Sequence, residues 1–357
     1  MTETLNFLLS GPGLIGRQHA KLLRSRSDCS LVAIVAPARP EHEAFARDCG
    51  ARFFTDVDEA LRHGNVDAAI VSSPNASHHQ QALACIASGV PVLIEKPVTA
   101  KLEDAGSLVK TAEQAKVPIL VGHHRTHSPL LDAVQDFLRS PYFGQPVALR
   151  GSALFYKPAK YFRDGEWRTK TGGGPILINM IHEIGLMRYF FGEISSVSAL
   201  ASSSIRSFEV EDTVAVSLRF ASGALGTFLL SDSAASTKSW EMTSGENPAY
   251  PHFPEEDCYH FAGTNGSLDF PSMNARYYKA DIEPSWWNEF EAARLPLIRA
   301  NPLERQLAHF VDVVLGRVSP RVSVRDGYLN MLVVDAIMRS IASGCIVSIS
   351  DNQGSQF

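Results

Sequence analysis

A glycine-rich turn near the start of the chain constrains its fold more than any other feature. The apolar run at residues 6–9 predicts a short buried strand, and the apolar positions at 20–23 predict a helix after the turn. In this order, Gly11 allows the turn, Gly13 lets a pyrophosphate approach the backbone, and Gly16 lets the helix pack on the strand. The sequence therefore predicts a dinucleotide-binding loop formed by Gly11, Pro12, Gly13, Leu14, Ile15 and Gly16.

The first third of the chain alternates apolar runs with helical patterns. Such alternation predicts an α/β domain with a doubly wound parallel sheet, here spanning residues 1–122. Residues 39–47 carry no clear pattern, and we expect an irregular segment there. The predicted later strands are 31–35, 66–72, 90–94 and 117–121, and the predicted helices include 79–88 and 102–112.

Residues 123–357 have a different pattern, which predicts a second, α+β domain. Ser128 is a suitable N-cap and Pro129 a suitable first residue for a helix. Residues 214–220 alternate apolar and polar side chains, and Asn265-Gly266 is a strong hairpin signal. We expect a large, mostly antiparallel sheet with helices on one face. Two late apolar stripes predict covering helices near 303–314 and 329–337, and residues 237–257 are expected to be irregular.

Composition narrows the class of protein. A chain of 357 residues with 45% hydrophobic residues fits a globular protein of two domains. The formal net charge of −5 argues against nucleic acid as the main partner. No apolar run approaches the roughly 18 residues needed to cross a bilayer, and the polar N-terminus does not resemble a signal peptide. The five cysteines form no C-x-x-C pair, so we expect reduced thiols and a cytoplasmic protein.

The end of the second predicted strand bears on the choice of cofactor. Ala36 stands where NAD-binding domains place an acidic residue for the ribose hydroxyl. Without that carboxylate, a 2′-phosphate is not repelled, and Arg39 or Arg17 could bind it. The cofactor is therefore NAD or NADP, and this pattern favours NADP. In the alternative interpretation Arg39 is a solvated loop charge and NAD binds without the usual anchor.

Two further segments carry residues suited to catalysis. Lys96 follows the strand at 90–94, at the edge of the sheet where ligands bind, and its ammonium could polarise a reacting oxygen. The glycine run at 172–174 leads into a helix that carries His182, a natural acid–base group near neutral pH. The plain alternatives are a surface turn at Lys96 and a structural histidine at 182.

Other polar and aromatic residues are candidates for substrate binding. His124 and Arg125 follow the strand at 117–121, and Trp167 and Arg168 precede the glycine run. His124 and His127 have a spacing that a metal could use, but no clustered cysteine or carboxylate supports a metal site, so we expect none. For the Trp167 segment, packing on the sheet is an equally reasonable interpretation.

Together these motifs resemble one family, the Gfo/Idh/MocA oxidoreductases. The resemblance rests on the glycine loop with His19, on Ser73-Pro74-Asn75 with His78, and on Glu95-Lys96-Pro97. It implies a Rossmann domain followed by a domain with a large antiparallel sheet, and a catalytic role for Lys96. It also implies a cis peptide bond before Pro97 and a cofactor-side location for five other residues: Ser73, Pro74, Asn75, His78 and Glu95.

The same resemblance makes His182 the second catalytic residue. The family has an aspartate four positions before this histidine, but Ile178 stands here, and Gly185 occupies a further acidic position. The adjacent Asn179 could hydrogen-bond to substrate in place of the aspartate.

These predictions describe an NAD(P)-dependent dehydrogenase. Its substrate would be a sugar, cyclitol or related hydroxy or keto compound, and the open sheet face would bury a partner subunit in a homodimer or homotetramer. Two alternatives remain. Ile178 and Gly185 favour a cofactor-bound ligand sensor without catalysis. The second alternative is a lyase or glycosidase that oxidises and reduces its bound nicotinamide within one turnover.

Overall fold

The computed structural model describes residues 4–63 and 65–351. By their internal contacts they form two compact units. The first contains residues up to His127 together with Leu303–Met331, and the second contains Ser128–Pro302 and the residues from Leu332 onward. We expected a division into 1–122 and 123–357. In the structure, Leu303–Met331 instead group with the first unit. The second boundary, between Met331 and Leu332, falls within one long helix, α11 (Val324–Ser343).

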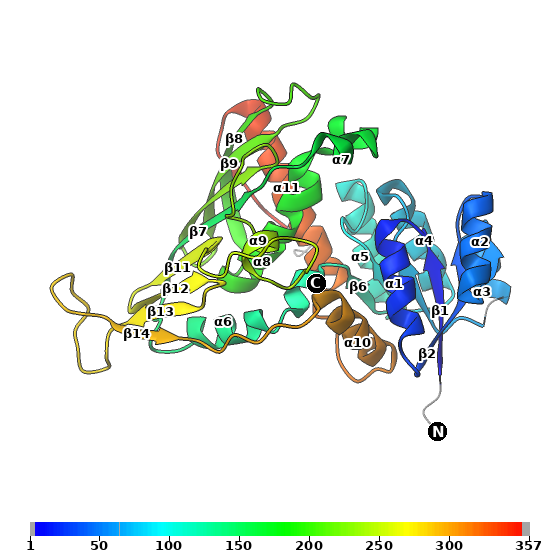
Figure 1. Ribbon diagram of the computed structural model, residues 1–357, viewed down its shortest axis with the longest axis horizontal. Helices are drawn as coiled ribbons and strands as arrows, with labels where there is room; N and C mark the ends of the chain where they lie inside the picture. Colours follow the sequence, from blue (N-terminus) through cyan, green and yellow to red (C-terminus); the bar gives the residue numbers. More distant parts are fainter. Residues whose placement is uncertain (1–3, 64, 352–357) are drawn as a thin grey trace. The chain divides into compact units, whose positions relative to one another are not determined.

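The described part of the first unit is built on a six-stranded sheet in the order β3-β2-β1-β4-β5-β6. Every strand pair is parallel, which confirms the predicted Rossmann-type architecture (Figure 1). The strands are β1 (Leu5–Ser10), β2 (Cys29–Val35), β3 (Arg52–Phe54), β4 (Ala68–Val71), β5 (Val92–Ile94) and β6 (Ile119–Val121).

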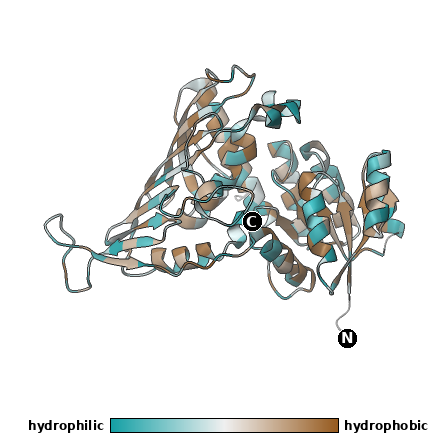
Figure 2. Ribbon diagram, viewed as in Figure 1, coloured by the Kyte–Doolittle hydropathy of each residue, from teal (hydrophilic) through white to brown (hydrophobic). Residues whose placement is uncertain are grey.

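Helices cover this parallel sheet. Leu23 of α1 and Phe310 of α10 pack with Phe7 and Leu9 in one buried cluster. Figure 2 shows hydrophilic residues on the outside of α1, as an amphipathic covering helix requires. The helices of this unit are α1 (Leu14–Arg24), α2 (Pro40–Cys49), α3 (Val57–His63), α4 (Asn75–Ala87), α5 (Leu102–Ala115), the 3₁₀ turn η1 (His124–His127) and α10 (Pro302–Val314).

The prediction of an irregular segment at 39–47 was wrong, because α2 occupies it. Pro40 stands at the start of this helix, where its missing N–H costs nothing, and Gly50 ends it with φ at 70°. Both signals are local ones that the sequence contains. The helical pattern of α2 is weak in the sequence because the helix has little apolar surface, and Ala46 is its one buried residue among those described.

The second unit is built on a nine-stranded sheet, as far as the described residues show, in the order β14-β13-β12-β11-β7-β10-β9-β8-β15. All pairs are antiparallel except β10 with β7. This confirms the predicted antiparallel sheet, including a hairpin at Asn265-Gly266. The strands are β7 (Pro146–Leu154), β8 (Ile194–Ser202), β9 (Thr213–Phe220), β10 (Leu225–Ser231), β11 (Tyr259–Gly263), β12 (Gly266–Phe270), β13 (Asn274–Tyr277), β14 (Glu291–Arg294) and β15 (Val347–Ser348).

One face of this sheet is covered by helix α8 (Ile181–Phe191). The rings of Phe190 and Phe191 in α8 lie 4.7 Å from Phe261 and 5.4 Å from Phe220, respectively. On the opposite face, small and polar side chains of the strands are exposed, together with Leu225 and Leu229 of β10. The remaining helices and turns of the unit are α6 (Leu130–Leu138), α7 (Ala159–Arg163), η2 (Glu166–Thr169), the π-helical turn η3 (Ile176–Met180) and α9 (Trp240–Thr243).

None of the helices within 4–63 and 65–351 combines the length and apolar character that crossing a bilayer needs.

Candidate functional site

Packing at the glycine loop requires two of its three glycines. Gly11 has φ at 85°, and a Cβ atom there would lie 2.4 Å from the backbone nitrogen of Ser73. A Cβ on Gly16 would lie 2.1 Å from the carbonyl oxygen of Gly11. Gly13 is different, because a Cβ placed on it meets no described atom within 4 Å. The loop is therefore fixed by its neighbours at both ends and faces open space at Gly13.

The start of α1 faces the same open space. Its N-cap residue is Gly13, which has no side chain to bond the first N–H groups, and the first turn holds no acidic residue. Leu14 is 83% exposed at this end. Uncapped N–H groups and the positive end of the helix dipole suit a pyrophosphate. The loop residues thus fit the dinucleotide that the sequence predicts.

The end of β2 presents cations and no carboxylate at the predicted acidic position. Ala36 is buried, and its N–H donates to the carbonyl of Phe54. Arg39 is exposed, with its guanidinium 4.0 Å from the carboxylate of Glu41. Arg17 lies over the ring of Phe45, 4.2 Å from its centroid, and its Nε donates to the carbonyl of Pro12 at 3.1 Å. Both arginines therefore belong to the segments that flank the glycine loop.

His78 joins the loop after β4 to the loop after β5. Its Nδ1 lies 2.9 Å from the carbonyl oxygen of Pro97, and its Nε2 lies 2.8 Å from that of Ser73. Burial lowers the pKa of His78, although both of these contacts oppose that shift. His78 is buried and bridges the two loops, and its predicted place on the cofactor side stays a prediction. Ser73 and Pro74 lead directly into α4, which begins at Asn75.

Glu95 and His19 form a buried pair beside the glycine loop. The Nε2 of His19 donates to Oε1 of Glu95 at 2.8 Å, and the His19 side chain is fully buried. Burial alone raises the pKa of Glu95, but the hydrogen bond from His19 and neighbouring positive charges outweigh it, so the pKa lies below its usual value. Gly122 allows this packing, because a Cβ there would lie 2.9 Å from the Glu95 carboxyl group. The pair joins α1 to the end of β5.

Lys96 follows Glu95 at the carboxyl edge of the parallel sheet. Its side chain is half-buried, and the peptide bond to Pro97 is cis, as the family resemblance implies. The glycine loop ends β1 and Lys96 follows β5, so both lie at the same edge of one sheet, with β4 between them.

In the second unit, the predicted acid–base residue lies on α8. His182 is buried one turn after Asn179, which belongs to the π-helical turn η3. The Nζ of Lys157 donates to Oδ1 of Asn179 at 2.7 Å. Glu183, the acidic residue next to His182 in the sequence, is buried and accepts a hydrogen bond from the Tyr259 hydroxyl. Asn179 and His182 therefore occupy neighbouring turns, with a lysine beside the first of them.

The glycine run before η3 packs against Glu211. Gly174 has φ at 79°, and a Cβ there would lie 2.7 Å from Oε1 of Glu211. The same oxygen accepts the backbone N–H of Ile176 at 2.9 Å. Burial raises the pKa of Glu211. Glu211 could not be singled out from the sequence, because no local pattern links it to a turn 35 positions earlier.

The remaining predicted substrate residues divide between the two units. In the first unit, Arg125 is buried in η1 and His124 is half-buried. Its neighbour His127 is also buried, and burial lowers its pKa to about 2. In the second unit, Trp167 is 53% exposed, whereas Arg168 lies over the ring of Tyr161.

No cluster of three or more His, Cys, Asp or Glu side chains in the described part of the chain could hold a metal ion.

Two family models match the chain, one for each kind of domain. Residues 5–123 match the model described as "Oxidoreductase family, NAD-binding Rossmann fold", and residues 131–269 match the "GFO/IDH/MocA C-terminal domain". The chain belongs to the Gfo/Idh/MocA family of oxidoreductases. The expected resemblance is thereby confirmed.

Named members of the Gfo/Idh/MocA family align along most of the chain. A 1,5-anhydro-D-fructose reductase of Ensifer adhaerens is 28% identical over 317 residues, covering 88% of this chain and 89% of the reductase. A scyllo-inositol 2-dehydrogenase (NAD(+)) of Bacillus subtilis is 25% identical over 366 residues, covering 98% and 97%. The fold matches a solved levoglucosan dehydrogenase, in complex with NADH and levoglucosan, with a TM-score of 0.78 at 21% identity, covering 98% and 100%. These relatives are dehydrogenases and reductases of hydroxyl or keto groups.

The buried His19–Glu95 pair predicts how the stability of the protein changes with pH. Because the pKa of Glu95 is lower in the folded protein, its stabilisation is complete above the usual value of 4.5 and is lost as pH falls through the folded value. We expect Glu95→Gln to lower the free energy of unfolding at pH 7 by about 1–3 kcal/mol, because a buried charged hydrogen bond is lost. The variant should also lose less stability than the parent on acidification, measured by denaturant unfolding between pH 7 and pH 3.

The exposed Glu59→Gln serves as the control and should follow the parent curve. Parallel curves for the parent and Glu95→Gln would show that the His19–Glu95 pair does not contribute as described.

Proposed function

We propose that this protein transfers hydride between a nicotinamide cofactor and a hydroxyl or keto group of a sugar, cyclitol or related compound. One observation carries the proposal. The backbone at Gly13, which faces open space, and the Lys96 side chain lie at the same edge of the parallel sheet. The named relatives, which act on anhydrofructose and inositol, support the substrate class.

The proposed roles follow from the chemistry of each side chain. A bound nicotinamide supplies the hydride chemistry. The Lys96 ammonium donates a hydrogen bond to the reacting oxygen and stabilises the negative charge that develops there. The His182 imidazole takes or returns the proton of that oxygen. Asn179 binds a substrate hydroxyl, while His124, Arg125, Trp167 and Arg168 contribute to substrate binding.

Replacing Lys96 separates binding from chemistry. We expect Lys96→Met to lower kcat by about 10²–10⁴-fold, because the transition state loses its cation, while the Kd for NADH stays nearly unchanged. Turnover is measured by nicotinamide absorbance with a panel of sugars, cyclitols and keto compounds, and binding by NADH fluorescence. Lys101→Met, an exposed lysine in the same loop, is the matched control.

A normal kcat in the Lys96→Met variant would show that Lys96 has no catalytic role. Cofactor binding by the parent protein without turnover of any compound would favour the sensor alternative, which Ile178 in place of the family aspartate supports.

We propose further that NADP(H) is accepted and preferred, with Arg39 and Arg17 binding its 2′-phosphate. Ala36 supports this because it brings no carboxylate to the ribose. We expect Arg39→Ala to weaken NADPH binding by about tenfold to hundredfold, as for a lost charge-assisted hydrogen bond, with little effect on NADH. Dissociation constants from fluorescence titration test this, with the exposed Arg47→Ala as control. Clearly tighter binding of NADH by the parent protein would contradict the proposal.

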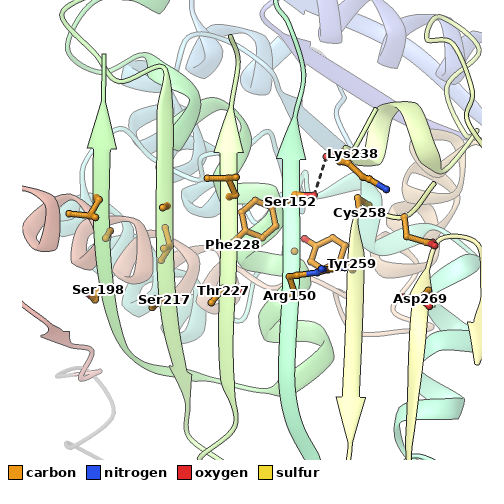
Figure 3. A pocket seen from close by; sticks show the side chains of 17 residues that line it. Arg150, Ser152, Ser198, Ser217, Thr227, Phe228, Lys238, Cys258, Tyr259 and Asp269 are labelled. Carbon is orange, nitrogen blue, oxygen red and sulfur yellow. Dashed lines mark hydrogen bonds between the residues drawn. The ribbon is translucent and has the colours of Figure 1, made fainter. Parts of the chain in front are cut away.

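The open face of the nine-stranded sheet supports a homodimer or homotetramer. Figure 3 shows this face, where Ser198, Ser217 and Thr227 project from β8, β9 and β10. This face carries a depression of about 680 Å³, lined by small polar side chains together with larger ones such as Leu200 and Leu229. Exposed leucines on an open sheet face suit packing against a second sheet. We propose that a second copy of the chain covers it.

Light scattering tests this assembly directly. We expect a mass of at least two chains at micromolar concentration, and Ser217→Arg should reduce it, because the long cation cannot be accommodated in a close sheet-to-sheet contact. Ser107→Arg, on an exposed position of α5, should leave the mass unchanged. A monomeric parent protein would contradict the proposed assembly.

A cytoplasmic location belongs to the same proposal. It is supported by the cysteines, none of which forms a disulfide among the described residues.

A further inference from the structure

Two cations of the second unit lie over one aromatic ring. The Nζ of Lys157 is 4.9 Å from the ring centroid of Tyr161, and the guanidinium carbon of Arg168 is 4.0 Å from it. Tyr161 is half-buried, and burial raises the pKa of its hydroxyl. A buried aromatic face attracts cations electrostatically, so the ring holds both side chains in place.

Lys157 also ties this cation pair to the helix that carries His182. Its Nζ donates to Asn179, one helical turn before His182, and only 12% of its side chain is exposed. Residues three apart on a helix share a face, which places the lysine on the Asn179–His182 side of the helix.

Arg168 is fixed from the other direction. Its Nη1 donates to the backbone carbonyl of Tyr161, and Gly165 makes room for it, because a Cβ there would lie 2.7 Å from Nη1. Its backbone packs on Gly173 in the glycine run, where a Cβ would lie 2.8 Å from Cα of Arg168. Within the described residues, the buried Nε of Arg168 has no hydrogen-bond partner. The guanidinium is thus held in place and retains an unused donor.

Carboxylates near this cation pair are engaged elsewhere. Asp164 pairs with Lys160 at 2.6 Å, and Glu166 pairs with Lys170 at 2.8 Å. Asp232 lies 3.8 Å from Lys157 but forms a closer pair with Arg206 at 2.7 Å.

Around Tyr161 and Asp232 the structure gathers three cations, Lys157, Arg168 and Arg206. A second carboxylate, Asp212, lies beside Arg206 and accepts the backbone N–H groups of Ile205 and Arg206. Glu211 is the other acid near Lys157, and it is engaged with the N–H of Ile176.

We propose that Lys157 and Arg168 bind an anionic group of the substrate, a carboxylate or a phosphate ester carried by a sugar or cyclitol. The inference rests on the proposed function, because it takes the side of α8 that carries His182 as the substrate side. An ammonium and a guanidinium together supply charge and several N–H donors, which is the chemistry that recognises oxyanions. Asn179, held by Lys157, remains beside the sugar hydroxyls.

Matched sugars test the charge preference. The kcat/KM values of D-glucose, D-glucuronate and D-glucose 6-phosphate are compared in the parent protein, and the two anions distinguish a carboxylate site from a phosphate site. We expect one anionic sugar to be preferred, and Lys157→Met or Arg168→Gln to lower its kcat/KM by about tenfold to hundredfold each. The kcat/KM for D-glucose should fall less than that for the preferred anion, so the ratio of the two values should drop in both variants. Lys157→Arg, which retains the charge, should keep the preference.

Lys160→Met is the matched control, since Lys160 is an exposed lysine of α7 paired with Asp164. Calorimetric titration of the protein–NADH complex with the same three sugars measures binding without chemistry. Circular dichroism checks the fold of each variant, and Arg168→Gln provides a test independent of the Lys157–Asp232 contact.

If an anionic sugar binds to the parent protein and binding is lost in both variants, the inference is supported even where no sugar turns over. The lack of turnover would then count only against the dehydrogenase proposal. Equal or better turnover of D-glucose overturns the anion site and leaves the dehydrogenase proposal standing. Failure of both anions to bind in calorimetry also overturns the anion site.

Discussion

The close approach of the glycine loop to the end of β4 is the constraint on which the first unit depends. Gly11 lies so near the backbone of Ser73 that no side chain fits, and Gly16 lies equally close to Gly11. This contact brings the start of α1 to the edge of the sheet where β5 ends. His78 and the His19–Glu95 pair then hold the neighbouring loops. The glycine loop and Lys96 share one framework because of this packing.

The second unit positions its polar residues by a different means. Here aromatic rings and buried charges, rather than close backbone contact, hold the segment between β7 and α8. Arg206 lies over the ring of Phe162 at 4.6 Å while pairing with Asp232, and Tyr161 holds two further cations. A segment with little regular structure is ordered in this way.

Local signals in the sequence were sufficient to predict much of the fold. The glycine loop, the alternating strands and the Asn265-Gly266 turn each act over a few residues, and the structure contains all three. Partnerships between distant residues were not predictable. His19 and Glu95 are 76 positions apart, and Lys157 and Asn179 are 22 apart. The candidate site residues could therefore be named from the sequence, whereas their partners and the π-helical turn depend on tertiary packing that no local pattern encodes.

The return of residues 303–331 to the first unit has a consequence for biosynthesis. The ring of Phe310 packs edge-on against Phe7, and Leu307 and Val311 lie in the same buried cluster. A ribosome therefore makes every described strand of the nine-stranded sheet except β15 before it makes α10, the helix that closes the Rossmann core. Until then, one face of the nascent parallel sheet has an apolar surface open to chaperones. The order of synthesis thus links completion of the cofactor domain to nearly the full length of the chain.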